Sequence, residues 1–323
     1  MSPELLEFEE PIAGLLKEIN ALQQQPRTDA RERQIETLQR KIAAARTELY
    51  ASLTPWQRVL VARHPERPNL DDFIKLLFTG FVEIHGDRRF ADDPAIMSGF
   101  ADYKEQPVLV VGHVKGRDTR EKIYRNFGYA RPEGYRKALR AMRLAEKFHR
   151  PIFVFVDTPA AYPGIESEER GVAEAIAVNL REIMLLDTPI VVLISGEGGS
   201  GGALGIAVGD CVLMQEFAIY SVIPPEGCAA ILWRDASKKV EAADALKLTA
   251  PDLLKAGIID EIVAEPAGGA QTAPAAAAQL VDGALERALR EISALDSGAR
   301  LQRRYDKFRH MGRLGVDFVD EGS

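Results

Sequence analysis

The sequence predicts an α/β protein built on a largely parallel sheet. Three near-continuous β-branched runs predict strands at 107–114, 151–156 and 189–195. Because these runs are apolar at almost every position, both faces of each strand should be buried, as in parallel strands covered by helices. Helical patterns lie between the runs, so the chain should form strand–helix–strand crossovers of ~40 residues each.

The first fifty residues predict two helices ahead of the sheet. Apolar residues recur at helical spacing from Leu5 to Leu22, and a second series runs from Ile35 to Leu49 in steps of three and four. Pro26 separates the two series, because proline cannot continue a helix interior. The pair should form a hairpin, which either caps the chain's own core or serves as an oligomer contact.

The remaining elements follow in order along the chain. Helical patterns cover 134–149 and 168–186, short strands are expected near 212–215 and 219–222, and an amphipathic helix pair covers 280–310. The low-complexity stretch AEPAGGAQTAPAAAA, 264–278, suggests a surface linker. We therefore expect a helical arm, a core, an Ala/Pro/Gly-rich linker, and C-terminal helices with a tail, at 1–53, 54–264, 265–279 and 280–323.

Composition excludes several classes of protein. The 323 residues are 46% hydrophobic, enough for a sizeable core, and carry 41 basic against 48 acidic side chains. A net charge of −7 disfavours a general nucleic-acid coat. Two cysteines make neither a disulfide framework nor a four-thiolate zinc site. With no signal-peptide pattern and no apolar run of ~18 residues, we expect a cytoplasmic protein without a metal on this chain.

The most informative segment is SGEGGSGGALGIAVG, 195–209, which leaves a buried strand and opens a helix. A phosphate-binding P-loop is rejected, because no lysine occurs between Ser195 and Gln215. A serine hydrolase is possible in principle, since Ser200 fits the nucleophile-elbow pattern G-x-S-x-G. Its base would have to be His113, the least implausible of the histidines, because only His310 follows the serine.

A backbone oxyanion hole fits this segment best. The N–H groups of Gly201, Gly202 and Ala203 would be free at the helix start and could hold a developing negative charge. Tight packing explains one or two of the glycines but not the whole cluster. A side chain at Gly202 is therefore expected to intrude where the backbone meets the ligand.

A basic segment lies upstream of the glycine-rich turn. Residues 115–143 carry ten basic side chains, with aromatic residues between them. In the loop 116–132 they suit phosphate groups or an acidic partner surface. From Arg136 to Arg143, a solvated helix face is the simpler interpretation. A scaffold or nucleic-acid-binding module that uses this segment is the non-enzyme alternative.

Several long motifs resemble one family. They are GHVKGRDTREKIYRNFGYARPEGYRKALR, DTPAAYPGIESEERG, GEGGSGGALGI and YSVIPPEGCAAILW, preceded by HPERP and IHGDR. In this order they resemble the alpha subunits of bacterial acetyl-coenzyme A carboxylase carboxyltransferases, over nearly the whole chain. Two positions depart from the pattern: Ala160 stands where the family usually has glycine, and Pro224 where serine is common.

The resemblance implies a crotonase-like fold, a spiral of ββα units shared with the Clp peptidases. It implies transfer of a carboxyl group from carboxybiotin, borne by a biotin carboxyl carrier protein, to acetyl-CoA, giving malonyl-CoA for fatty acid synthesis. Backbone N–H groups would stabilise the ureido oxygen of biotin as charge develops there. The family's partners are a zinc-ribbon beta subunit in an α2β2 assembly and biotin carboxylase.

The same resemblance assigns site residues. Catalytic oxyanion donors would be Gly201, Gly202 and Ala203. Substrate-binding residues would come from the glycine turn, the loop after the second strand and the basic loop: Gly198, Gly199, Ser200, Tyr162, Pro163, Gly164, Arg117, Arg125, Phe127 and Arg131. A Clp-like serine peptidase that uses Ser200 remains the alternative enzyme.

Overall fold

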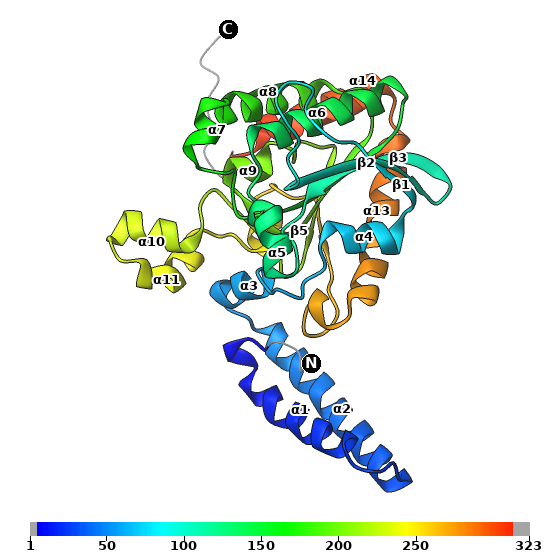
Figure 1. The fold of residues 1–323 in the computed structure, drawn as a ribbon, viewed down its shortest axis with the longest axis vertical. Coiled ribbons are helices and arrows are strands. Elements are labelled where there is room, and N and C mark those ends of the chain that lie inside the picture. Colours follow the sequence, from blue (N-terminus) through cyan, green and yellow to red (C-terminus); the bar gives the residue numbers. More distant parts are fainter. Residues whose placement is uncertain (1–4, 313–323) are drawn as a thin grey trace.

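The computed structural model describes residues 5–312, and its centre is one mixed sheet (Figure 1). Within these residues the strand order is β1-β2-β3-β4-β5-β6-β8, and β7 pairs with the end of β5. The strands are β1 Thr79–Glu83, β2 Ile96–Tyr103, β3 Gln106–His113, β4 Ile152–Thr158, β5 Ile190–Gly199, β6 Cys211–Gln215, β7 Ile219–Ser221 and β8 Glu261–Val263.

The parallel core is confirmed. β3, β4, β5, β6 and β8 pair in parallel, whereas β1, β2 and β3 form an antiparallel meander. Every residue of β4 is buried, as an apolar strand between two layers requires. Its alternate side chains enter different cores: Val154 packs with the cluster on one face, and Phe153 and Phe155 with the cluster on the other.

Helices cover both faces of the sheet. One core cluster joins α6 and α8 to the sheet, and the other joins α4 and α13 to it. The helices of the body are α3 Pro55–Ala62, α4 Leu70–Leu77, α5 Thr119–Tyr124, α6 Pro132–Lys147, α7 Ile165–Glu169, α8 Val172–Leu185, α9 Ser200–Leu204, α10 Pro225–Trp233, α11 Lys239–Ala245, α12 Ala250–Lys255, α13 Pro274–Ser293 and α14 Ser297–His310.

The predicted hairpin is present as α1 (Glu10–Gln23) and α2 (Asp29–Ala51), and it projects from the body (Figure 1). Its apolar seam is buried between its own two helices, around Ile12, Ile19, Leu38 and Ile42. Only its base touches the body, where Tyr50 packs against Phe217. The interpretation of the hairpin as a cap on the chain's own core is therefore wrong for most of its length.

The predicted linker is also wrong in its second half. α13 begins at Pro274, and its residues Ala277 and Ala278 are buried. The segment looks like low complexity because it is rich in alanine, yet alanine is the best helix former and proline suits the first helical position. The end of the predicted tail, residues 313–323, lies outside the described residues.

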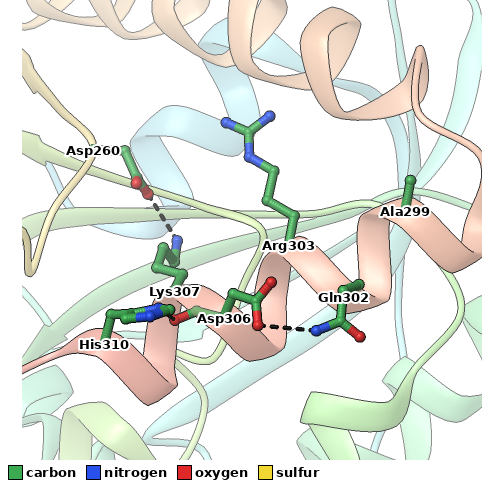
Figure 2. A pocket seen from close by; sticks show the side chains of 7 residues that line it. All are labelled: Asp260, Ala299, Gln302, Arg303, Asp306, Lys307 and His310. Carbon is green, nitrogen blue, oxygen red and sulfur yellow. Dashed lines mark hydrogen bonds and ion pairs between the residues drawn. The ribbon is translucent and has the colours of Figure 1, made fainter. Parts of the chain in front are cut away.

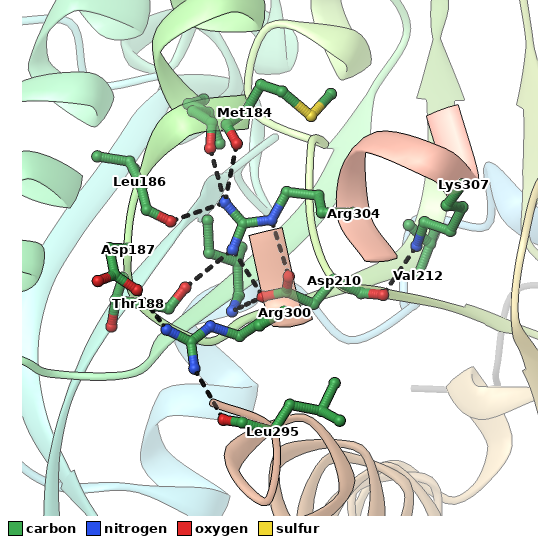
Figure 3. Close-up of polar contacts among 12 residues, drawn as sticks. Met184, Leu186, Asp187, Thr188, Asp210, Val212, Leu295, Arg300, Arg304 and Lys307 are labelled. Carbon is green, nitrogen blue, oxygen red and sulfur yellow. Dashed lines mark hydrogen bonds and ion pairs between the residues drawn. The ribbon is translucent and has the colours of Figure 1, made fainter. Parts of the chain in front are cut away.

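One buried arginine fixes α14 to the body (Figure 3). The Arg304 guanidinium donates to both carboxylate oxygens of Asp210 at 2.8 Å. It also donates to the carbonyls of Ile183, Leu186 and Thr188 at 2.8–3.0 Å, at and after the C-terminal end of α8. Arg304 therefore satisfies carbonyls that a helix end leaves without partners, while Asp210 balances its charge.

Candidate active site

Loops from three neighbouring strands meet at one edge of the sheet. β3 ends at His113, β4 at Thr158 and β5 at Gly199, and β4 lies between the other two. In parallel sheets this carboxyl edge is where ligands bind. A bridge between Ala130 and Ala161 joins the loop after β3 to the loop after β4. The predicted site residues lie on these loops and on the turn after β5.

Packing requires two glycines of the turn between β5 and α9. A Cβ on Gly199 would collide with the Pro159 carbonyl, and one on Gly202 would collide with the backbone of Ala160 and Ala161. The Cβ direction of Gly202 thus points at a neighbouring loop. Our expectation that a side chain there would intrude on the ligand is wrong, because it would displace that loop instead.

Other glycines of the segment also have packing roles. A Cβ on Gly198 would lie 2.7 Å from the Tyr220 ring, and one on Gly205 would lie 2.6 Å from the Tyr135 ring. Packing therefore explains more of the cluster than the sequence suggested. Gly201 differs, since its Cβ would meet only Ile176 Cδ1, at 3.6 Å.

Gly201 lines a cavity of about 420 Å³ in front of α9. The walls are mostly apolar and include Leu204, Tyr220, Val222 and Phe308, while Ser200 lies at the same edge. The first N–H groups of a helix have no acceptor within it and mark its positive end. Of the three predicted donors, Gly202 and Ala203 are buried, so Gly201 is the one that lines the cavity.

Two buried polar side chains hold α9 from behind. The Tyr135 hydroxyl donates to the Gly202 carbonyl at 3.3 Å, and Asn179 Nδ2 donates to the Gly205 carbonyl at 2.8 Å. The same amide nitrogen donates to the Tyr135 carbonyl at 2.9 Å. Ser200 itself has φ +50°, an uncommon value for a non-glycine residue. α6 and α8 therefore fix the short helix in one position.

The geometry disfavours a serine hydrolase. His113 is 1% exposed, and burial lowers its pKa to about 3, with the charge of Lys115 acting in the same direction and a Gly202 backbone contact opposing. Neither ring nitrogen of His113 has a hydrogen-bond partner in the described chain, and His310 Nδ1 contacts the Asp306 carbonyl, so neither candidate base is bonded to Ser200. A serine without a positioned base is a weak nucleophile.

A buried ion network lies beneath the turn. Lys115 Nζ is 2.7 Å from both Asp157 Oδ1 and Glu197 Oε1. Glu197 also pairs with Arg63 at 2.6 Å, and its own N–H donates to Asp157 Oδ1. These bonds tie the end of β3 to the ends of β4 and β5.

The network keeps Glu197 and Lys115 charged. Burial alone would raise the pKa of Glu197, but Lys115 and Arg63 outweigh it and hold the pKa below its usual range. Burial would likewise lower the pKa of Lys115, and Asp157 and Glu197 reverse that effect. The sequence signal for this network is a carboxylate at the end of each of two adjacent parallel strands, Asp157 in β4 and Glu197 in β5.

The structure brings together part of the predicted substrate-binding set. The Arg131 guanidinium lies 5.0 Å from the Tyr162 ring centroid, and that ring packs beside Gly164. Thr158 Oγ1 donates to the Gly128 carbonyl, which holds the loop of Phe127 against β4. Phe127 itself is half exposed in a left-handed conformation, and Pro163 is exposed.

Two predicted arginines have partners within the chain. Arg117 pairs with Asp71 and Asp72 of α4. Arg125 donates to the Pro94 carbonyl at 2.9 Å and lies near Glu121. Both guanidinium groups therefore position loops. The predicted solvated face of α6 is also wrong at Lys137, which is fully buried and contacts Asp92 and the Asp93 carbonyl.

A second, more open cavity lies on α14 (Figure 2). Its two best-placed cations already have partners, because Lys307 pairs with Asp260 and Arg303 with Glu291. Gln302 Nε2 donates to the Asp306 carboxylate, which keeps its negative charge. The cavity therefore offers little to an anionic ligand. In residues 5–312, no three His, Cys, Asp or Glu side chains gather as metal ligands would, and no helix has the length and apolarity to cross a bilayer.

Comparison with solved structures identifies the fold. A Pseudomonas malonate decarboxylase hetero-tetramer in complex with coenzyme A matches with a TM-score of 0.54 and 18% identity, over 68% of this chain and 90% of that one. Transcarboxylase 12S with methylmalonyl-coenzyme A matches with a TM-score of 0.53 and 19% identity, over 66% of this chain and 41% of that one. The predicted crotonase-like fold is confirmed.

Sequence relatives identify the family. The acetyl co-enzyme A carboxylase carboxyltransferase-like family matches residues 5–312. The acetyl-coenzyme A carboxylase carboxyl transferase subunit alpha of Geobacter metallireducens is 54% identical over 96% of this chain and 98% of its own length. That of Halalkalibacterium halodurans is 50% identical over 97% of both chains. The chain belongs to the family of acetyl-CoA carboxylase carboxyltransferase alpha subunits.

Proposed function

We propose that this chain is the subunit of a carboxyltransferase that handles carboxybiotin, and that the enzyme carboxylates acetyl-CoA to malonyl-CoA. Family membership supports the class of reaction. The observation that carries the site is the strand-to-helix turn at Gly201, which opens on an apolar cavity of about 420 Å³. A backbone donor next to an apolar wall suits a ring whose polar atom gains negative charge.

The residues present fit a small bicyclic ligand. Carboxybiotin, when bound, supplies the carboxyl group. Leu204, Tyr220 and Phe308 would exclude water from its ring, which strengthens each polar contact there. The N–H groups of Gly201, Gly202 and Ala203 would hold the oxygen on which charge develops, and Gly201 has the open approach. Gly198, Gly199 and Ser200 would frame the entrance.

The loops beside the turn would contact the substrates. The Arg131 guanidinium lies over the Tyr162 ring, and both residues lie on the loops at this sheet edge together with Pro163, Gly164 and Phe127, of which Pro163 and Phe127 are exposed. We assign to this group contacts with acetyl-CoA or with the biotin carrier protein. Arg117 and Arg125 would contribute by ordering the loop that carries them.

A beta subunit would complete the enzyme, in an α2β2 assembly that also receives the biotin carboxyl carrier protein and works with biotin carboxylase. Large apolar side chains that are 64–75% exposed support a covering partner. They are Ile165 at the start of α7, Leu185 at the end of α8, Ile231 and Leu232 in α10, and Val222 just before α10. The names of the relatives, as alpha subunits, support the presence of a partner subunit.

The test uses the full chain with and without a candidate beta subunit. We expect no carboxyl transfer from malonyl-CoA to biotin by the purified chain alone, and turnover after mixing, because one oxyanion turn supplies only part of the machinery. In the complex, Ser200→Ala should stay within roughly tenfold of wild type, since its hydroxyl is not a nucleophile. Turnover by the chain alone, or a loss of several orders of magnitude in Ser200→Ala with assembly intact, would contradict the proposal.

A further inference from the structure

A third cavity, of about 370 Å³, is lined by five arginines. It lies between the loop after β1, helix α6 and the first half of α8, away from the cavity at Gly201. Arg88 and Arg89 come from the loop, and Arg136, Arg140 and Arg143 from α6. The sequence favoured a solvated helix face here, and Arg88, Arg89 and Arg143 are exposed. The fold adds that the loop after β1 brings its two arginines to the same cavity as the three of α6.

The positive charge of this cavity is only partly balanced. Arg136 pairs with Asp87 at 2.8 Å, and Arg143 with Glu182 at 2.6 Å. Among the described residues, no carboxylate lies within ion-pair distance of Arg88, Arg89 or Arg140.

Backbone carbonyls hold Arg140 in place without neutralising it. Its guanidinium donates to the carbonyls of His85 and Gly86 at 2.9–3.2 Å. Burial lowers the pKa of Arg140, and the nearby charge of Arg88 lowers it further, while Asp87 and Asp92 oppose this without reversing it. The two guanidinium groups therefore repel each other across the cavity, and an anion between them would relieve that repulsion.

A buried amide in the same wall has a free acceptor. Asn179 is 1% exposed, and the two donor bonds of its Nδ2, described above, fix the orientation of the amide. Its Oδ1 has no hydrogen-bond partner in the described chain. Since buried polar atoms are normally satisfied, this oxygen suits a hydroxyl or amino group of a ligand. The Glu174 carboxylate, also in the wall, would likewise accept a hydrogen bond from a hydroxyl or amino group.

We propose that this cavity binds a small molecule that carries phosphate beside a hydroxyl or amino group, as a nucleotide does. The guanidinium groups of Arg88 and Arg89 bind the phosphate oxygens through paired N–H donors, and Arg140 adds its positive charge and its Nη1, since its Nε and Nη2 donate to backbone carbonyls. Asn179 and Glu174 accept from the uncharged part. This site goes beyond the proposed function, because it shares no lining residue with the cavity at Gly201.

Two sources could supply such a ligand: the nucleotide portion of coenzyme A, or a free nucleotide. The test measures binding of inorganic pyrophosphate, ADP and coenzyme A to the full chain by calorimetry at physiological ionic strength, where weak surface attraction is screened. Arg88→Ala/Arg89→Ala removes two exposed cations of the cavity. Arg33→Ala/Arg40→Ala removes two exposed cations of α2 and is the charge-matched control.

We expect pyrophosphate to bind, and the Arg88/Arg89 double variant to weaken it roughly tenfold or more while the control changes less than about twofold. ADP should bind more tightly than pyrophosphate, because it also reaches Asn179. If coenzyme A displaces ADP, the ligand is the nucleotide portion of coenzyme A. If it does not, the ligand is a free nucleotide. No binding at millimolar pyrophosphate, or equal weakening in both double variants with unchanged melting temperatures, would overturn the site.

Discussion

At the scale of single residues, neighbouring glycines in the turn have different roles. Gly202 is a glycine because the backbone of Ala160 and Ala161 occupies the space of its side chain, whereas Gly201 has room for a methyl group. The sequence pattern predicted the turn but could not separate the two, because the segment that presses on Gly202 lies about forty residues earlier in the chain.

This difference predicts opposite outcomes for two alanine substitutions. Gly202→Ala should lower the free energy of unfolding by roughly 1–3 kcal/mol, and activity with it, as the loop after β4 is pushed away. Gly201→Ala should be neutral or slightly stabilising, since alanine is preferred to glycine inside a helix. Thermal unfolding and turnover of both variants in the complex test this; equal losses in the two would show that the packing argument is wrong.

Lys115 allows a prediction that includes pH. The depressed pKa of Glu197 means that its ion pairs stabilise the fold above the usual carboxyl pKa and weaken as pH falls; the raised pKa of Lys115 preserves them toward high pH. Lys115→Met leaves Asp157 and Glu197 with less opposite charge, so the pKa of Glu197 should rise.

The cost of Lys115→Met should therefore be largest near pH 8, on the order of 3 kcal/mol for a broken buried pair, and shrink toward pH 4–5 as Glu197 takes up a proton. Chemical denaturation across this range measures it. Lys75→Met, at a side chain 72% exposed, is the control and should show no such trend. A cost that is constant with pH would contradict the charged network.

At the scale of elements, the sequence predicted what lies deep in the sheet better than what lies at its edges. The three uniformly apolar runs became β3, β4 and β5, because burial on both faces leaves a strong signal. β1 and β2 contain Gly80, Ser98 and Gly99, and β8 has only three residues, so none of them shows a clear pattern. The third cavity, lined by five arginines, could not be predicted for a different reason, because it forms only where the loop after β1 packs against α6.

Arg304 shows how one side chain can secure a whole helix. Arg304→Met would leave Asp210 buried without its cation and release the four carbonyls to which Arg304 donates, so we expect a loss of about 3–5 kcal/mol. Arg303→Met, one residue away and 51% exposed, should change stability by less than about 1 kcal/mol. Urea unfolding of both variants makes the comparison, and similar midpoints would show that the pair is not essential.

At the scale of the whole molecule, the chain consists of a body and a projecting hairpin with its own small core (Figure 1). Removing residues 1–51 should shift the melting temperature of the body by only a few degrees, because only the base of the hairpin packs on it. If the hairpin is an oligomer contact, the assembled mass with a beta subunit should fall. Light scattering and calorimetry on the truncated chain test both points, and an unfolded body would contradict them.

The bond between Arg304 and Asp210 also has a consequence for the order in which the protein matures during synthesis. Asp210 precedes β6, a strand that parallel pairing places inside the sheet, yet its cation is 94 positions later. A ribosome must add those residues before the carboxylate gains its partner. Until then the Asp210 carboxylate, which is buried next to the first residue of β6, has no cation to balance its charge. Nascent chains halted before Arg304 should therefore be readily digested by proteases. The body therefore reaches its full stability only after translation has passed Arg304 and α14 has formed.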